Sequence, residues 1–245
     1  AVHDISGFGK CSLTVALPVV SATGVECACM PTALFSTHTG EFTGWTFRDL
    51  TDQMLPMARH WHSIGVPFDG IYSGYLASPA QVGLLGRVID ELAGPETLIV
   101  CDPAMADNGR LYPAFDDSFP AEMARVCAKA DVIVPNLTEA SLLTGVDIHC
   151  NDDLPRAAKA FFDLGLENVF ISLGAGGVYF DDGRERGILP CFPSPVINTT
   201  GCGDAFLAAA ACAWQEGCSL REMALHGLAA SAICARSDSA VSHHP

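Results

Sequence analysis

The sequence predicts an α/β fold in which helices cover both faces of a mostly parallel sheet. Short apolar runs that favour buried strands occur at residues 2–5, 71–76, 98–101, 132–134 and 169–172. Segments with helical spacing follow most of these runs, and this alternation is typical of parallel strands joined by crossover helices. No internal repeat or long linker interrupts the 245 residues, so we expect a single domain over residues 1–245.

The predicted helices lie at residues 12–22, 79–92, 120–130, 139–143, 154–164, 204–215 and 220–235. Right-handed crossovers place the carboxyl ends of the strands along one edge of the sheet, where ligands bind. The first part of the chain differs, because a β-favouring run at 25–35 leads into a Thr- and Gly-rich loop at 36–44. We expect the segment at about 25–45 to form a small β/loop lid or the rim of a substrate site.

The composition disfavours several classes of partner. With 13 Lys and Arg against 28 Asp and Glu, the formal net charge is −15, which repels nucleic acid and acidic membrane surfaces. No apolar run reaches the roughly 18 residues of a membrane span, and no charged segment precedes an apolar run at the start, so we expect no secretory signal. The 11 cysteines, many of them in apolar runs, predict reduced thiols and a cytoplasmic location.

The most informative motif is NTTGCGDAF at residues 198–206. Gly201 and Gly203 allow backbone N–H groups to point toward a ligand at the start of a helix, which creates an anion site suited to phosphate. Asp204 then lies in the first helical turn, where it can remove a proton from a hydroxyl group held against a phosphoryl group. The alternative is a plain glycine-rich turn with Asp204 as a helix cap.

Other polar residues follow the predicted strands and converge on the same edge. Asp102 and Asp107 come after one buried strand, and Asn136 and Glu139 come after another. The carboxylates of Asp102, Asp107 and Glu139 together suit a hydrated Mg²⁺ ion, which prefers oxygen ligands and keeps its waters. Alternatively, Asp102 and Asn136 only cap turns, since Asp-Pro and Pro-Asn are ordinary turn dipeptides.

Two weaker signals lie nearer the start of the chain. The segment GFGK at residues 7–10 matches neither a P-loop nor a dinucleotide fingerprint, so it is interpreted as a tight turn without a ligand role. His38, in the loop at 36–44, is a candidate for contact with a substrate ring, although a lone loop histidine is more often structural.

At this point a family resemblance can be stated. NTTGCGDAF resembles the GxGD signature of the ribokinase superfamily of carbohydrate and vitamin kinases. Residues 1–145 look like the pyridoxal/pyridoxamine kinases through HDISGFGKCSL (3–13), FSTHTGEF (35–42), SGYLAS (73–78), CDPAMADNGRLY (101–112) and PNLTEASLLTG (135–145). The later stretches, LENVFISLGAGGVYF and VINTTGCGDAFLAA, are closer to sugar and nucleoside kinases, especially the pseudouridine-kinase-like branch.

The resemblance implies a ribokinase-like fold and a role for each matching residue. Asp204 would be the catalytic base, with amides supplied to the anion site by Gly201, Cys202 and Gly203. The residues near the nucleotide and its phosphates would be Asp107, Asn136, Glu139, Ser172, Gly174 and Thr200. The residues facing the acceptor would be Asp4, Ser6, His38, Thr39 and Tyr75. Asp102 and Glu139 would hold the metal.

The same resemblance implies ATP and Mg²⁺, often with a monovalent cation such as K⁺, and a homodimer, for which the run at 25–35 offers an edge strand. The leading hypothesis is ATP-dependent phosphorylation of the hydroxymethyl group of pyridoxal, pyridoxamine or pyridoxine. A second hypothesis changes the acceptor to pseudouridine or another nucleoside, hydroxymethylpyrimidine or a sugar. A third is a non-catalytic sensor of a vitamer or nucleotide, against which the intact Asp204 and carboxylate set argues.

Overall fold

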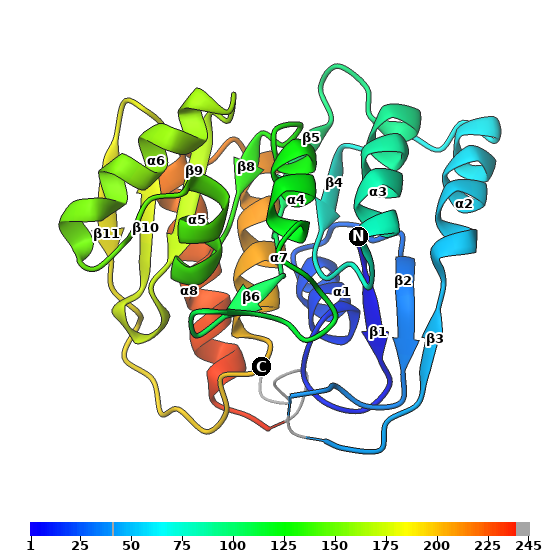
Figure 1. Ribbon diagram of the computed structural model, residues 1–245, viewed down its shortest axis with the longest axis horizontal. Helices are drawn as coiled ribbons and strands as arrows, with labels where there is room; N and C mark the ends of the chain where they lie inside the picture. The colour runs from blue at the N-terminus through cyan, green and yellow to red at the C-terminus, as the bar shows by residue number, and fades with distance from the viewer. Residues whose placement is uncertain (41, 239–245) are drawn as a thin grey trace.

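A nine-stranded sheet forms the centre of the computed structural model, which describes residues 1–40 and 42–238 (Figure 1). The strand order is β11-β10-β9-β8-β5-β4-β1-β2-β3. Neighbouring strands from β9 to β2 are parallel, whereas β10 and β11 at one end and β3 at the other are antiparallel. The bounds are β1 (Val2–Ser6), β2 (Met30–Phe35), β3 (Phe47–Asp49), β4 (Gly70–Ser73), β5 (Leu98–Cys101), β8 (Val132–Ile133), β9 (Asn168–Ser172), β10 (Val178–Asp181) and β11 (Arg186–Leu189).

Helices cover both faces of this sheet, which confirms the predicted fold class. One layer contains α1 (Leu13–Ala22), α7 (Cys202–Gln215) and α8 (Leu220–Ala235). The other contains α2 (Thr51–Ser63), α3 (Pro79–Leu92), α4 (Phe119–Cys127), α5 (Leu137–Thr144) and α6 (Leu154–Asp163). The carboxyl ends of the parallel strands meet at the lower edge in Figure 1, where α7 begins. Within the described residues, no helix combines the length and apolar character needed to cross a membrane.

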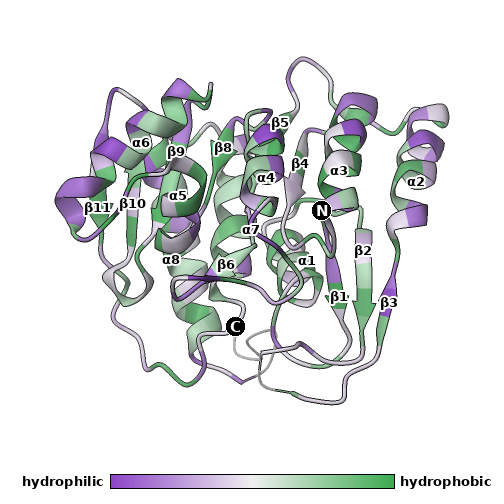
Figure 2. Cartoon of the chain, viewed as in Figure 1, coloured by the Kyte–Doolittle hydropathy of each residue, from purple (hydrophilic) through white to green (hydrophobic). Residues whose placement is uncertain are grey.

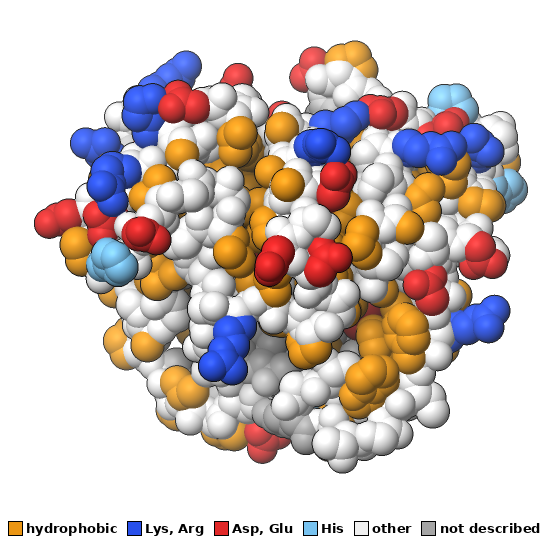
Figure 3. Space-filling view, in the orientation of Figure 1, with side chains coloured by type: hydrophobic (Ala, Val, Ile, Leu, Met, Phe, Trp, Pro, Cys, Tyr) orange, Lys and Arg blue, Asp and Glu red, His pale blue; other side chains and the backbone are white. Residues whose placement is uncertain are grey.

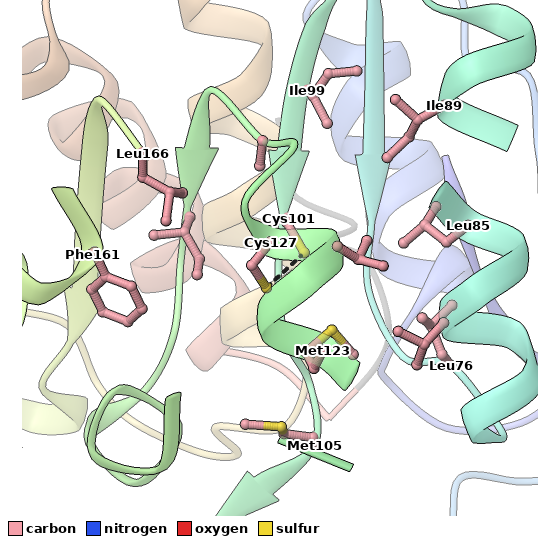
Figure 4. Packing of buried hydrophobic residues seen from close by; sticks show 14 of the residues in the cluster. Leu76, Leu85, Ile89, Ile99, Cys101, Met105, Met123, Cys127, Phe161 and Leu166 are labelled. Atoms are coloured by element: carbon pink, nitrogen blue, oxygen red, sulfur yellow. Dashed lines mark hydrogen bonds between the residues drawn. The ribbon is translucent and has the colours of Figure 1, made fainter. Parts of the chain in front are cut away.

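Two apolar clusters fill the space between the sheet and its helical layers. The cluster beneath α2–α6 includes Met123, Phe161 and the neighbouring thiols of Cys101 and Cys127, whose Sγ atoms are 3.6 Å apart (Figure 4). All eleven cysteines are free thiols. Figure 2 shows hydrophilic residues on α2 and α6, where those helices meet solvent, and a mostly hydrophobic α7.

Helix α7 is apolar around most of its surface because the sheet, α1 and α8 all pack against it. Its run of alanines lets these neighbouring elements approach the α7 backbone closely on several sides. Gly227 of α8 makes room for the Phe206 ring of α7, since a Cβ at that position would lie 2.5 Å from the ring. Helix α7, which begins at the glycine-rich motif, is therefore held by the sheet and by two neighbouring helices.

The β-favouring run at 25–35 is placed differently from the expectation. Only its second half is a strand, β2, and β2 lies inside the sheet between β1 and β3. The prediction that this run is an edge strand is therefore wrong, because β3 occupies the edge. Figure 3 shows hydrophobic side chains near β2 and β3, the segment that carries the exposed Leu34, Trp45 and Phe47. The loop between these strands stays the candidate substrate rim, and homodimerisation stays a prediction.

Several elements have no counterpart in the sequence pattern. Helix α2 buries only Met54, Leu55 and Ala58, so its apolar stripe is narrow. Strands β10 and β11 have four residues each, which is too short for a periodic signal. The hairpin of β6 (Ala106–Asp107) and β7 (Arg110–Leu111) is shorter still, and it places the segment after β5 over the ligand edge of the sheet.

Replacing Phe161 by Ala should lower the free energy of unfolding by about 3–5 kcal/mol, because the ring is fully buried and its loss leaves a cavity. Urea denaturation followed by circular dichroism measures the change. Phe192→Ala is the matched control, since that ring is 43% exposed and its loss should change stability by less than about 0.5 kcal/mol. Equal effects of the two substitutions would contradict the described core.

Candidate active site

Helix α7 starts at the glycine-rich motif, and its two glycines serve different purposes. Gly201 caps the helix in the left-handed region at φ 78°. A Cβ on Gly201 would lie 2.7 Å from the backbone oxygen of Lys10, so both conformation and space require glycine there. Around Gly203, by contrast, no atom of the described residues beyond its own helical turn lies within 4 Å of a Cβ position, so this side of the first turn of α7 has room for a ligand. An anion would meet backbone N–H groups and the positive end of the helix dipole there.

Two hydrogen bonds orient the Asp204 carboxylate in this first turn. The backbone N–H of Ser12 donates to Oδ2 at 2.8 Å, and Oδ1 lies 2.9 Å from Nε2 of His3. The Asp204 side chain is 14% exposed, so it is mostly enclosed yet reachable. Each carboxylate oxygen has a second lone pair, which leaves acceptor capacity for the hydroxyl group of a bound molecule.

His3 connects Asp204 to a second carboxylate. Its Nδ1 lies 2.9 Å from Oδ1 of Asp4, and the ring is buried. Burial lowers the pKa of His3, but hydrogen bonds to Asp204 and Asp4, together with their negative charges, outweigh burial and raise it to about 10. Although the Asp4 backbone N–H also approaches Nδ1, at 2.9 Å, two carboxylates around one ring favour the imidazolium form. Gly74 leaves room for the ring, because a Cβ there would collide with it.

Asp4 and Ser6 lie behind Asp204 rather than against an open cavity. They are 4% and 2% exposed, and the Ser6 hydroxyl donates to Oδ2 of Asp4 at 3.2 Å. His3 takes the other oxygen of Asp4. In the structure these two residues therefore support His3 and Asp204, and their contact with a substrate ring stays a prediction. They are buried because β1 is a central strand with helices on both faces, which cover its side chains.

Glu139 is buried and engaged by backbone N–H groups. Its Oε1 accepts hydrogen bonds from Met105 (2.8 Å) and Ala106 (3.3 Å), and its Oε2 accepts one from Asn136 (2.9 Å). Burial raises the pKa of Glu139 to about 7, although these hydrogen bonds oppose the shift. Glu139 thus holds the loop after β5, and this bonding leaves it less available as a metal ligand than the sequence predicts.

Asp102 is the better-placed carboxylate for a cation. Its Oδ1 accepts a hydrogen bond from the Ala104 N–H at 3.0 Å. Burial and the negative charges of Glu139 and Asp204 raise its pKa well above the usual range, so Asp102 lies close enough to both carboxylates to be repelled by them. A divalent cation would relieve this repulsion. Among the residues described, no group of three His, Cys, Asp or Glu side chains has metal-binding geometry. Mg²⁺ takes one or two carboxylates and keeps waters and phosphate oxygens, a ligand set to which Asp102 could contribute.

The remaining predicted nucleotide residues lie along the edge from β8 to α7. Asn136 caps α5, since its Oδ1 accepts from the Glu139 N–H at 3.0 Å, as the turn-cap alternative predicts. Ser172 ends β9 and pairs with Asn136 in an isolated bridge. Gly174 begins the exposed turn that follows, with φ 57°. Thr200 lies in the loop before α7.

Asp107 stands apart from this group. It is exposed, and its two carboxylate oxygens accept hydrogen bonds from the backbone and side-chain nitrogens of Asn108 at 2.8 and 3.0 Å. Its charge contributes to the raised pKa of Glu139, so it lies near the carboxylate group without bonding to it.

The predicted acceptor residues His38, Thr39 and Tyr75 occupy different environments. His38 is buried, packs over Gly9 and meets the Phe42 ring edge-on, with the ring centres 4.9 Å apart. Thr39 is exposed on the same loop. Tyr75 is half-buried, and burial and the charge of Asp4 raise the pKa of its phenol to about 12. The effect of Asp4 on this phenol places Tyr75 on the Asp4 side of the site.

Tyr75 belongs to an aromatic group beside the carboxylates. Its ring centre is 5.9 Å from that of Phe115 and 6.4 Å from that of Tyr112. Burial and the charges of Glu139 and Asp102 are the main causes that raise the pKa of Tyr112, so this phenol is close to the carboxylate group. A flat ring bound near Asp204 would meet aromatic surface on this side.

Sequence reasoning missed four residues that build the site: His3, Lys10, Ser12 and Gly74. All belong to stretches that carried the family resemblance, HDISGFGKCSL and SGYLAS, yet none was assigned a role. The GFGK segment, interpreted as a turn without a ligand role, packs directly against Gly201. The hydrogen bonds of His3, Lys10 and Ser12 to the segment 198–204 join residues 188 to 201 positions apart, and no local sequence pattern predicts them.

A parallel sheet between two helical layers, with a glycine-flanked aspartate starting a helix at its ligand edge, defines a ribokinase-like fold. A family model described as pfkB family carbohydrate kinase matches residues 87–245. The chain belongs to this family.

Individual relatives point to small-molecule kinases. A Bacteroides thetaiotaomicron protein assigned as a phosphomethylpyrimidine kinase is 36% identical and superposes with a TM-score of 0.84, covering 93% of this chain and 81% of its own. A second crystal form of that relative contains pyridoxal. Bos taurus pyridoxal kinase is 29% identical over 69% of this chain, and Haemophilus influenzae ribokinase is 38% identical over 47%. The chain spans 56% and 38% of the length of these two enzymes, and 18% of another curated relative.

The raised pKa of His3 predicts a pH-dependent stability. In the unfolded chain a histidine loses its proton near pH 6.5, whereas folded His3 keeps it until about pH 10. The stabilisation is therefore complete below about pH 6.5 and is lost as the pH rises through 10, with a slope on the order of 1 kcal/mol per pH unit between these values. Urea midpoints from pH 6 to 10 should fall less steeply for His3→Gln than for His60→Gln, the surface control. Parallel curves would contradict the imidazolium assignment.

Proposed function

We propose that this protein is an ATP-dependent kinase that phosphorylates the hydroxymethyl group of a B6 vitamer, with Asp204 as the general base. The observation that carries the proposal is the position of Asp204 in the first turn of α7, with its carboxylate oriented by Ser12 and His3. An acceptor hydroxyl held at Asp204 would lie at the N-terminus of the helix, where backbone N–H groups favour a transferring phosphoryl group.

In the proposed reaction, Asp204 accepts the proton of the acceptor hydroxyl as that oxygen attacks the γ-phosphorus of ATP in line, and ADP leaves. The amides of Gly201 and Gly203 would meet the charge that develops on the phosphoryl oxygens. The Cys202 N–H, expected from the resemblance to join them, instead donates to the Thr199 carbonyl oxygen at 3.1 Å. Asp102 would hold Mg²⁺, which neutralises charge on the β- and γ-phosphates when bound. His3 keeps its positive charge throughout and fixes the direction of the Asp204 carboxylate.

The choice of acceptor rests on the first part of the chain. Residues 1–145 carry the resemblance to pyridoxal kinases, and the aromatic group of Tyr75, Tyr112 and Phe115 suits a flat pyridine ring. The pyridoxal in one crystal form of the Bacteroides relative supports the same acceptor class. That relative is also assigned as a phosphomethylpyrimidine kinase, which makes hydroxymethylpyrimidine the second candidate.

Asp204→Asn should lower the turnover number by about 10²–10⁴-fold while ATP still binds, because the amide cannot accept the hydroxyl proton. Turnover is measured by coupled ADP release, and ATP binding by titration calorimetry. Asp163→Asn, at an exposed position on α6, should behave as the wild type. Near-wild-type turnover of the Asp204 variant would exclude Asp204 as the base.

The acceptor is decided by competition. Mass spectrometry of a reaction with Mg-ATP and equal amounts of pyridoxal, pyridoxamine, pyridoxine, hydroxymethylpyrimidine and pseudouridine should show a phosphorylated B6 vitamer as the main product. Phosphorylation of another member would keep the Asp204 mechanism and overturn the acceptor. Binding of ATP and vitamer without any product on long incubation would favour a non-catalytic sensor.

A further inference from the structure

Lys10 is a buried cation that the proposed reaction does not use. Its side chain is 1% exposed, in a chain with only three lysines and a net charge of −15. Removing an ammonium group from water is costly unless its N–H groups all find acceptors. A lysine in this position must therefore be held by strong local partners.

Three backbone carbonyl oxygens surround the ammonium group. Nζ of Lys10 donates to the oxygens of Asn198 at 2.8 Å, Cys234 at 2.7 Å and Ser237 at 2.6 Å. Three acceptors require three N–H donors, so the group is a protonated ammonium whose donors are all used. Within residues 1–40 and 42–238, no carboxylate forms an ion pair with Lys10.

Carbonyl dipoles therefore balance this charge. Cys234 lies in the last turn of α8, and Ser237 follows two residues after that helix ends at Ala235. The final carbonyl groups of a helix lack intrahelical partners and carry the negative end of the helix dipole. Together with Asn198, they form an oxygen cage of the kind that also replaces the water shell of K⁺ in proteins.

The cage is joined to the catalytic motif. Asn198 is the first residue of NTTGCGD, and its Oδ1 accepts a hydrogen bond from the Thr200 N–H at 2.8 Å. The backbone oxygen of Lys10 packs against Gly201, and two residues later the Ser12 N–H holds Asp204. The segment from Lys10 to Ser12 thus contacts the glycine-rich loop at three places. These are Asn198 at its start, Gly201 at the helix cap and the proposed base, Asp204.

We propose that the Lys10 ammonium is a built-in monovalent cation that fixes the loop 198–204 for catalysis, so that the enzyme needs no added K⁺. The catalytic part of this inference rests on the proposed kinase function, whereas the cation cage itself does not. Lys10 acts as a positioning residue, because its ammonium group donates to one carbonyl at the start of the loop that carries the anion site and Asp204, and to two carbonyls at the end of α8.

The wild-type protein provides the first test. Its melting temperature, and its turnover with the acceptor found above, should stay the same when KCl is replaced by choline chloride at equal ionic strength, since choline is too large for the cage. A clear rise of either quantity with K⁺ in the wild type would overturn the proposal.

Lys10→Met provides the second test, because it empties the cage while keeping an apolar stem of similar length. In choline chloride its turnover should fall on the order of 10²-fold through displacement of the loop. K⁺ and NH₄⁺ should restore turnover and raise the melting temperature in this variant only. Lys159→Met, on the exposed face of α6, is the matched control and should respond to neither ion.

Three outcomes remain distinct. Loss of activity in Lys10→Met without rescue by K⁺ or NH₄⁺, in a protein that melts cooperatively, would overturn the proposal, as would unchanged turnover in choline. If the variant does not fold in choline but folds in KCl or NH₄Cl, the cage is confirmed by folding itself. If the wild type phosphorylates no acceptor, the proposed function fails, and the ion-dependent melting of the variant still decides the cage.

Discussion

The hydrogen bonds that Asp204 accepts from His3 and Ser12 depend on contacts between the first strand of the chain and a helix that begins some 200 residues later. For them to form, β1 must lie at the centre of the sheet and α7 must start at the carboxyl edge of that strand. The insertion of β1 between β4 and β2 meets the first condition. The packing of α7 between α1 and α8 meets the second.

Buried charge around this edge is balanced in three different ways. The imidazolium of His3 is flanked by two carboxylates, the carboxylate of Glu139 is surrounded by backbone N–H groups, and the ammonium of Lys10 is enclosed by backbone carbonyls. Asp102 and Asp204 keep acceptor capacity for a cation and for a hydroxyl group. The carboxyl groups with this capacity thus lie where the proposed reaction needs a cation ligand and a proton acceptor.

Prediction from sequence succeeded where signals are local. The bounds of α3 were predicted from helical spacing and those of β5 from a continuous apolar run, and both agree with the structure. The pattern did not predict α2, which buries few apolar residues, or β10 and β11, which have only four residues each. The sequence pattern also placed β2 at the edge of the sheet, because β-propensity does not report whether another strand, here β3, pairs with its free side.

The same division holds at the candidate site. The sequence alone determined that two glycines and an aspartate would open a helix, since glycine conformation and helix dipoles act over a few residues. It also indicated that Asp102 and Glu139 would meet at one sheet edge, because parallel strands share their direction. Only the tertiary structure decided that His3 pairs with Asp204, that Asp4 supports His3, and that Lys10 is enclosed by carbonyls of α8. Those partners are set by chain topology, through contacts between residues too far apart in sequence for any local pattern to report.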